Sequence, residues 1–191
     1  DQDVSAALGE VFSVGRDGAL PATANNGTVI AAAFDAQKQA TSISYNATTI
    51  PMDAKKSVQL SGQYIVKNKI DLWAKTSVIA LNALNSGMTL AADATDNVLF
   101  RFSGSTALPA WGNQNNIIGG AYNILKAGGA LVRKNPAFPR AFSDPGGSFM
   151  TNWNITDVSF AGPYGIMLGD VYSQQVTISD FHCVGTVEQI L

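Results

Sequence analysis

Apolar and polar residues alternate in short runs through the first half of the chain. An alternation of period two places apolar side chains on one face of a strand and polar side chains on the other. Turn-forming residues such as Ser61-Gly62 and Asp96-Asn97 separate the runs. The pattern predicts strands of four to six residues, with alternating apolar positions at Ile43/Tyr45, Val58/Leu60, Tyr64/Val66, Ile70/Leu72, Met88/Leu90 and Val98/Phe100/Phe102.

One segment breaks this rhythm. From Thr28 the chain reads TVIAAAFDAQKQA, which is rich in Ala, lacks Gly and Pro, and spaces Ile30, Ala33, Phe34 and Gln37 as on one helical face. With Thr28 as the cap, the segment predicts one short helix over about residues 29–40. The residues before it, 1–20, have scattered apolar positions and are expected to form an N-terminal arm.

Residues 105–150 have a different composition. They hold four of the seven prolines and the glycine pairs at 119–120, 128–129 and 146–147. Such a composition predicts long loops that interrupt the strands, and long loops in compact domains often have a functional role.

An internal repeat near the C-terminus indicates the fold class. WNITDVSFAG (153–162) aligns without gaps with VTISDFHCVG (176–185). Self-similar strands at a period of about 20–30 residues are typical of a β-solenoid, in which equivalent strands stack in register. The same strand-then-Gly ending recurs in NVLFRFSG (97–104). The sequence therefore predicts an all-β, right-handed parallel β-helix with a short N-terminal capping helix, over residues 21–191 and with regular coils at 151–191.

The segments AAAFDAQKQA, LSGQYIV, IDLWAKTSVIAL, GMTLAA and NVLFRFSG resemble the opening of the pectate-lyase-like right-handed parallel β-helix proteins, and most of all their bacteriophage tailspike branch. The resemblance covers roughly residues 15–104 and 152–191. Two positions depart from the family pattern: Leu60-Ser61, and not Pro, precedes Gly62, and the stretch 42–57 is longer than usual. Members of the family typically carry more coils than 191 residues supply, so we expect the solenoid to be truncated at its C-terminus.

The resemblance implies a function. Proteins of the tailspike branch are homotrimers that bind bacterial surface polysaccharide, capsule or O-antigen, along the solenoid and cleave its glycosidic bonds by hydrolysis or elimination. The arm would attach to other proteins of the virion tail, and the protein would be located in the phage tail or outside the cell. The catalytic residues could also lie beyond this segment.

Two aspartates form the one carboxylate pair with a geometric argument. Asp157 and Asp180 occupy equivalent positions of the repeat, so their backbones should lie about 4.8 Å apart. Two carboxyl groups at such a separation could act as a retaining glycosidase pair. Alternatively, both aspartates could sit at a bend and hydrogen-bond the local backbone.

Three further residues offer weaker chemistry. Trp111, in the polar segment AWGNQNN, could stack on a sugar ring or anchor its own loop. His182, the single histidine, is the repeat partner of Ser159 and should face solvent, which leaves little basis for a triad or a metal site. Cys183 matches Phe160 at an inward position and is expected to be a small core residue.

Composition excludes several function classes. The net charge of −2 and the pI near 5.2 lack the positive charge that nonspecific nucleic-acid binding requires. No apolar run reaches the length of a membrane span, the single cysteine excludes an internal disulfide, and no glycine pair has the spacing of a nucleotide-binding loop. No cofactor or metal is therefore predicted.

Two alternatives to the depolymerase remain open. The chain could be a noncatalytic structural module of a virion tail or an adhesin. It could also be a secreted lyase, for which clustered aspartates would be expected to bind calcium, and the chain offers only the dispersed Asp144, Asp157, Asp170 and Asp180.

Overall fold

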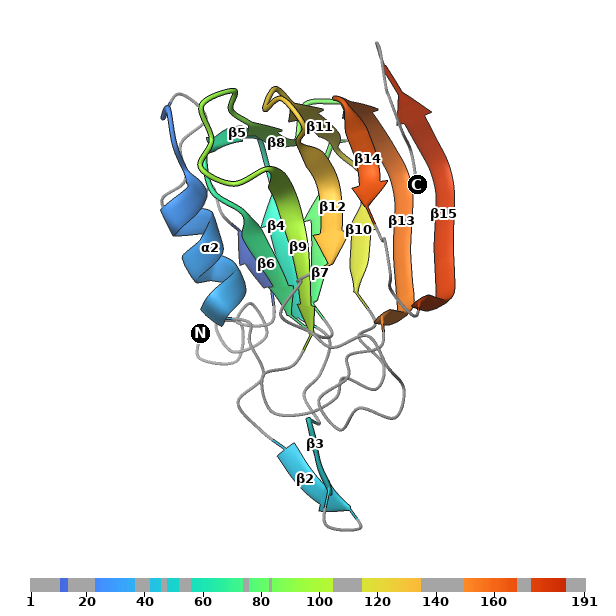
Figure 1. The fold of residues 1–191 in the computed structure, drawn as a ribbon. Coiled ribbons are helices and arrows are strands. Elements are labelled where there is room, and N and C mark those ends of the chain that lie inside the picture. The colour runs from blue at the N-terminus through green and yellow to red at the C-terminus, as the bar shows by residue number, and fades with distance from the viewer. Residues whose placement is uncertain are drawn as a thin grey trace.

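The computed structural model consists mainly of parallel strands (Figure 1). It describes residues 11–13, 23–36, 42–45, 48–51, 56–73, 76–82, 84–104, 115–134, 150–167 and 173–184. Within these ranges there is one helix, α2 (Gly27–Ala36). The strands are β1 (Val11–Ser13), β2 (Ser42–Tyr45), β3 (Thr48–Pro51), β4 (Lys56–Leu60), β5 (Gln63–Val66), β6 (Ile70–Trp73), β7 (Thr76–Ala80), β8 (Gly87–Leu90), β9 (Val98–Gly104), β10 (Asn116–Ile118), β11 (Ala121–Ile124), β12 (Ala130–Lys134), β13 (Met150–Ala161), β14 (Tyr164–Met167) and β15 (Ser173–Cys183).

Nine strands form one large sheet in which every pairing is parallel. Its order is β1-β4-β7-β10-β13-β11-β8-β5, and β15 pairs with β13 outside this path. The order turns back at β13, so the sheet has a first arm (β1, β4, β7, β10) and a second arm (β5, β8, β11). The long strands β13 and β15 run through both. A four-stranded parallel sheet, β14-β12-β9-β6, forms the remaining side, and β2 and β3 form a separate antiparallel hairpin.

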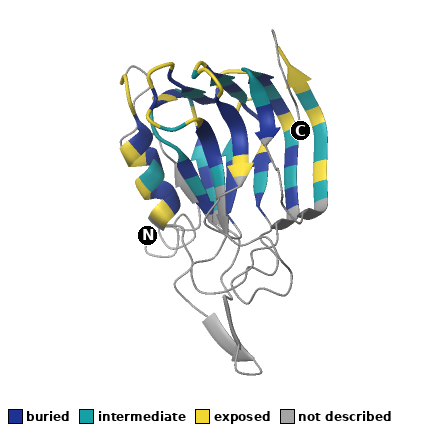
Figure 2. Cartoon of the chain, viewed as in Figure 1, coloured by how far each residue is buried: buried dark blue, intermediate teal, exposed yellow. Residues whose placement is uncertain are grey.

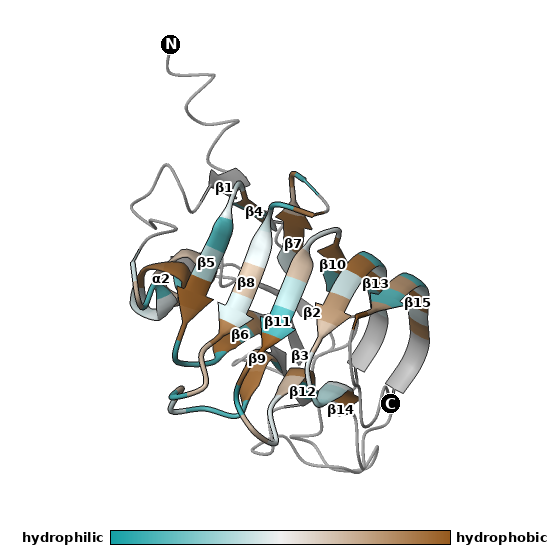
Figure 3. Ribbon diagram, turned by 90° about the horizontal axis from the view of Figure 1, so that it is seen from above, coloured by the Kyte–Doolittle hydropathy of each residue, from teal (hydrophilic) through white to brown (hydrophobic). Residues whose placement is uncertain are grey.

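Parallel neighbours require the chain to return to the same end of the sheet before each new strand. Here other strands make the return, since the chain passes through β5 and β6 between β4 and its neighbour β7. As a result the two arms and the four-stranded sheet surround a common interior, which Figure 3 shows from above.

This architecture corrects the predicted fold class. The sequence predicted an all-β, right-handed parallel β-helix solenoid. Instead, the large sheet continues from its first arm to its second arm through β13 and nearly closes into a barrel. The sheet stays continuous because the first half of β13 pairs with β10 and its second half with β11, with a bend between them at Asp157. Together with α2, the nearly closed parallel sheet is closer to an α/β barrel than to a solenoid.

The interior is apolar because each strand turns alternate side chains inward. Residues in register repeat their chemistry from strand to strand, and Figure 2 shows the resulting buried layer. Aromatic rings meet edge to face in this core, with 5.6 Å between the ring centroids of Phe100 and Tyr122. The inward positions of the three sides are Val58, Val78, Ile117 and Ile155; Tyr64, Met88, Tyr122 and Phe160; and Ile70, Phe100, Val132 and Ile166.

Helix α2 packs against β6 and covers one end of this core. Ile30, Ala33 and Phe34 are buried there, as their helical spacing predicted. The helix begins earlier than predicted. The Ile30 amide donates to the Asn26 carbonyl, and the Asn25 side chain accepts hydrogen bonds from the Gly27 and Lys67 amides, so these asparagines form the start that was assigned to Thr28.

Two other boundaries differ from the prediction. Strands β10, β11 and β12 lie within residues 105–150, where long loops were predicted. The glycine pairs of this region that the structure describes are turns between short strands, with φ of 69° at Gly119 and 103° at Gly120. In the predicted arm, β1 pairs with β4 and so belongs to the large sheet.

Candidate functional site

The two candidate carboxylates lie where β13 and β15 bend. Thr156 pairs with Ser179 and Val158 pairs with Phe181, so Asp157 and Asp180 face each other across the pair. This register confirms the predicted alignment of the two repeat units. Both aspartates are exposed, and neighbouring strands set their backbones about 4.8 Å apart.

Backbone geometry explains why aspartate occurs at these positions. The φ angles are 56° at Asp157 and 51° at Asp180, in the left-handed region, and the neighbouring strand position is Gly119, with φ of 69°. Apart from glycine, residues with a short polar side chain enter this region most readily. The predicted bend is therefore present. Within the part of the chain that the structure describes, no hydrogen bond or ion pair is found for either carboxylate.

Beside the bend, the outer face of the first arm carries a column of short polar side chains that we call the amide ladder: Ser77, Asn116, Asn154 and Thr177. They occupy one register position on β7, β10, β13 and β15. The side-chain amide of Asn116 donates to the Ser77 hydroxyl over 2.8 Å. The side-chain amide of Asn154 donates to the side-chain oxygen of Asn116, also over 2.8 Å. The hydrogen bonds orient the side chains along the column, so consecutive rungs present similar groups at strand spacing.

A second column lies between the amide ladder and the bend. It consists of Ile79, Ile118, Thr156 and Ser179, in register on the same four strands. The Thr156 and Ser179 hydroxyls lie 3.2 Å apart and share a hydrogen bond. Ile118 is 41% exposed, although its neighbours in the strand, Ile117 and Asn116, are fully buried and half-buried. The face therefore combines uncharged hydrogen-bonding groups with an apolar strip made of the exposed Ile118 and the half-buried Ile79.

The two columns offer uncharged hydrogen-bonding groups and apolar side chains on one face. Among the described residues, no group of three or more His, Cys, Asp or Glu side chains could hold a metal ion. Two of the four dispersed aspartates, Asp144 and Asp170, lie outside the described residues. Amides and hydroxyls can donate and accept hydrogen bonds, as a sugar hydroxyl requires of its partners.

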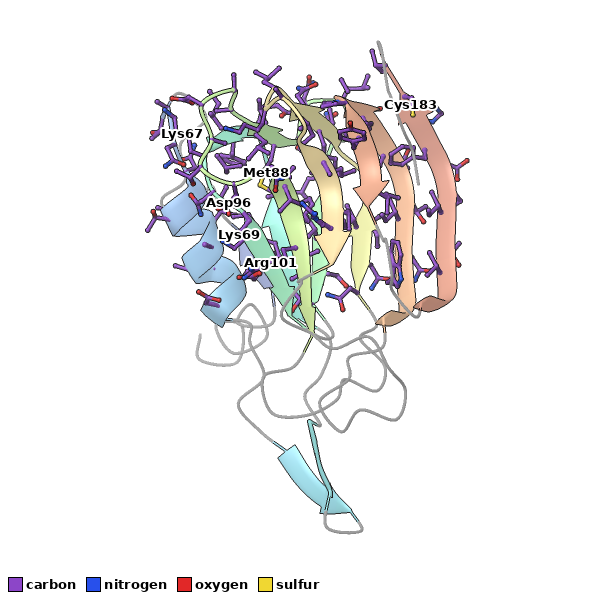
Figure 4. All side chains as sticks on the ribbon, viewed as in Figure 1. Lys67, Lys69, Met88, Asp96, Arg101 and Cys183 are labelled. Carbon is purple, nitrogen blue, oxygen red and sulfur yellow. The ribbon has the colours of Figure 1, made fainter. Side chains whose placement is uncertain are left out.

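Of the remaining candidates, those that the structure describes do not lie on this face. Trp111 lies outside the described residues. His182 pairs with Ser159 on the second arm and is exposed, as predicted. Cys183 pairs with Phe160, as predicted, but it is exposed (Figure 4) because no described strand covers the far side of β15.

Sequence reasoning missed the amide ladder. Its members precede an inward β-branched residue in all four strands: Ser77-Val78, Asn116-Ile117, Asn154-Ile155 and Thr177-Ile178. A search for a short polar residue before each inward Val or Ile could have found them. Residue 116 escaped notice because it lies in the region that was predicted to be loops.

Charged side chains gather on other surfaces. On the four-stranded sheet, Arg101 donates two hydrogen bonds to the Asp71 carboxylate, at 2.5 and 2.8 Å. Near the start of α2, Lys69 pairs with Asp96 at 3.0 Å (Figure 4). The nearby Lys67 donates a hydrogen bond to Asp93, and this bond lowers the pKa of the Asp93 carboxyl.

Comparisons with known proteins identify no relative. No protein-family model matches the chain, and neither curated proteins nor solved structures give a significant match. The resemblance to tailspike proteins therefore remains a prediction. Within the described ranges, no helix has the length and apolar character needed to cross a membrane.

Proposed function

We propose that this chain binds a polysaccharide along the outer face of the first arm. The observation that carries the proposal is the amide ladder, in which the half-buried Asn116 and Asn154 are held at one register position by hydrogen bonds to each other and to the buried Ser77 hydroxyl. Strand spacing of about 4.8 Å is comparable to the length of a sugar ring. A linear glycan that crosses the strands would thus meet a similar set of polar groups at each ring.

The neighbouring column supports the same ligand. Sugar rings present hydroxyls at their edges and C–H groups on their faces, so a complementary surface needs both polar and apolar contacts. Ile79 and Ile118 offer the apolar strip beside the ladder, and Thr156 and Ser179 continue it with hydroxyls. Bacterial surface polysaccharide, the predicted partner, is the glycan class that we propose. Assembly as a homotrimer and attachment to virion tail proteins remain predictions.

The test places a long charged side chain on the face. Ile118→Lys should abolish retention by immobilised capsule or O-antigen polysaccharides, because the lysine would project over the ladder. Ile65→Lys is the matched control: Ile65 is an outward isoleucine in β5 of the second arm and is 36% exposed, close to the exposure of Ile118. If both variants bind as the wild type does, the ladder face is not the binding surface.

Cleavage is a second candidate function, and the pairing of Asp157 with Asp180 is the observation that favours it. Carboxyl groups of retaining glycosidases lie about 5–5.5 Å apart, close to the spacing of adjacent strands. Release of reducing ends from a bound polysaccharide would test this function. Asp157→Asn should abolish the release while binding persists. A wild-type chain that binds glycan and releases no reducing ends would leave binding as the function.

A further inference from the structure

The charges around the amide ladder bear on which polysaccharide it can accept. The described outward residues of the first arm on β7, β10, β13 and β15 are Ser, Thr, Asn and Ile, with no Lys or Arg among them. The nearest charged groups along these strands are Asp157 and Asp180. Lys69, Arg101 and their carboxylate partners belong to other surfaces of the molecule.

The two carboxylates give this face a negative edge. They are exposed, and among the described residues neither has a cationic partner. Asp157 directly follows Thr156, and Asp180 directly follows Ser179, so a glycan lying on the second column would pass beside both aspartates. Carboxylates of a bound uronic or sialic acid would be repelled there, and no described cation on the face would compensate.

We infer that the ladder face is selective for neutral polysaccharides and that Asp157 and Asp180 exclude acidic ones. This inference rests on the proposed function and names its substrate class. Selection arises from repulsion of the wrong ligand and not from extra contacts with the right one, which is a common route to specificity. The apolar strip of Ile79 and Ile118 also favours an uncharged sugar face over a charged one.

The experiment compares polymers that differ only in charge. Dextran and laminarin are the neutral probes, and their carboxymethylated derivatives are the acidic probes, all measured at the same pH of about 8, where carboxymethyl groups are ionised. At 10 mM salt the wild type should bind each acidic derivative at least about fivefold more weakly than its neutral parent. In 0.5 M salt the difference should fall below about twofold, because salt screens exposed charges.

Variants separate this effect from the overall charge of the protein. Asp157→Asn/Asp180→Asn should bind parent and derivative equally, and asparagine suits the left-handed backbone of both sites. The control Asp35→Asn/Asp93→Asn removes two exposed carboxylates elsewhere and should keep the wild-type preference. Equal binding of both polymers by the wild type would overturn the neutral selectivity alone. Absence of binding to every probe, parent and derivative, would overturn the proposed function together with the selectivity.

Discussion

Among the glycines that the structure describes in the large sheet, Gly87 is the one where an added carbon would come closest to a backbone atom. It lies between Gln63 of β5 and Ala121 of β11. A Cβ at residue 87 would lie 2.0 Å from the Ala121 carbonyl oxygen, against an ordinary contact of 3.4 Å or more. The strands β8 and β11 would have to separate to restore an ordinary contact. The Gln63 side chain, which donates to the same oxygen over 3.1 Å, would also have to move.

The cost of Gly87→Ala follows from the hydrogen bonds near the clash. Two backbone hydrogen bonds join the two strands: the Ala121 amide donates to the Ser86 carbonyl at 2.9 Å, and the Leu125 amide donates to the Leu90 carbonyl at 2.9 Å. Separation of the strands would break or strain both, at about 1–3 kcal/mol for each buried group left unpaired. The φ of 154° adds about 1 kcal/mol of strain for a residue with a side chain. We therefore expect a loss of about 4 kcal/mol in the free energy of unfolding.

Thermal and urea unfolding measure this loss. For a domain of this size, about 4 kcal/mol corresponds to a fall of roughly 10 °C in melting temperature. Gly128→Ala is the control, because its φ of 67° carries similar strain but no atom lies within 4 Å of the added Cβ. That variant should lose only about 1 kcal/mol. If the two variants unfold at the same temperature, the close pairing of β8 with β11 is refuted.

Three other expectations concern single side chains. Burial raises the pKa of Tyr122 well above its ordinary value, so stability present below about pH 10 is lost as pH rises further. The Tyr122→Phe variant should therefore lose less of its free energy of unfolding than the wild type does as the pH is raised in unfolding experiments. A variant with the same pH profile as the wild type would contradict this. Asp157→Gly should unfold at or above the wild-type temperature, whereas Asp157→Val should lose about 2 kcal/mol in the free energy of unfolding, because a β-branched residue is strained at φ of 56°. Equal stability of these two variants would exclude a left-handed bend at Asp157. Asp71→Asn should cost about 1 kcal/mol by weakening the two hydrogen bonds from Arg101, a loss that urea unfolding would detect.

Local patterns predicted much of the secondary structure. Period-two alternation located β2, β4, β5, β6, β8 and β9, and helical spacing identified the buried residues of α2. Both patterns reflect the spacing of the side chains that are buried in the core, and this spacing is visible in the sequence alone. The internal repeat predicted the pairing of β13 with β15, including the match of Trp153 with Val176.

The fold class could not be predicted in the same way. Whether the sheet is continuous depends on which strands pair with each half of β13 on either side of the bend at Asp157, and the sequence around the bend does not show those partners. Strands β10 to β12 were missed because they are short and because glycine turns, such as Gly119-Gly120, resemble loops in sequence. Pairing between distant strands, and not local propensity, determines their structure.

The candidate site shows a similar division. The sequence predicted that Asp157 and Asp180 are neighbours, because a repeat identifies equivalent positions. It did not reveal the amide ladder, because the visible repeat contains only Asn154 and Thr177, while Ser77 and Asn116 lie outside it. Only the pairing of β7, β10 and β13 brings Ser77, Asn116 and Asn154 together.

The most direct test of the account is a crystal structure of the chain with an oligosaccharide of a neutral bacterial polysaccharide. We expect the glycan to cross β7, β10, β13 and β15 on their outer face, with sugar hydroxyls on Asn116 and Asn154 and a ring face on Ile118. A glycan bound to the four-stranded sheet, or to the second arm, would contradict the assignment of the amide ladder as the binding surface.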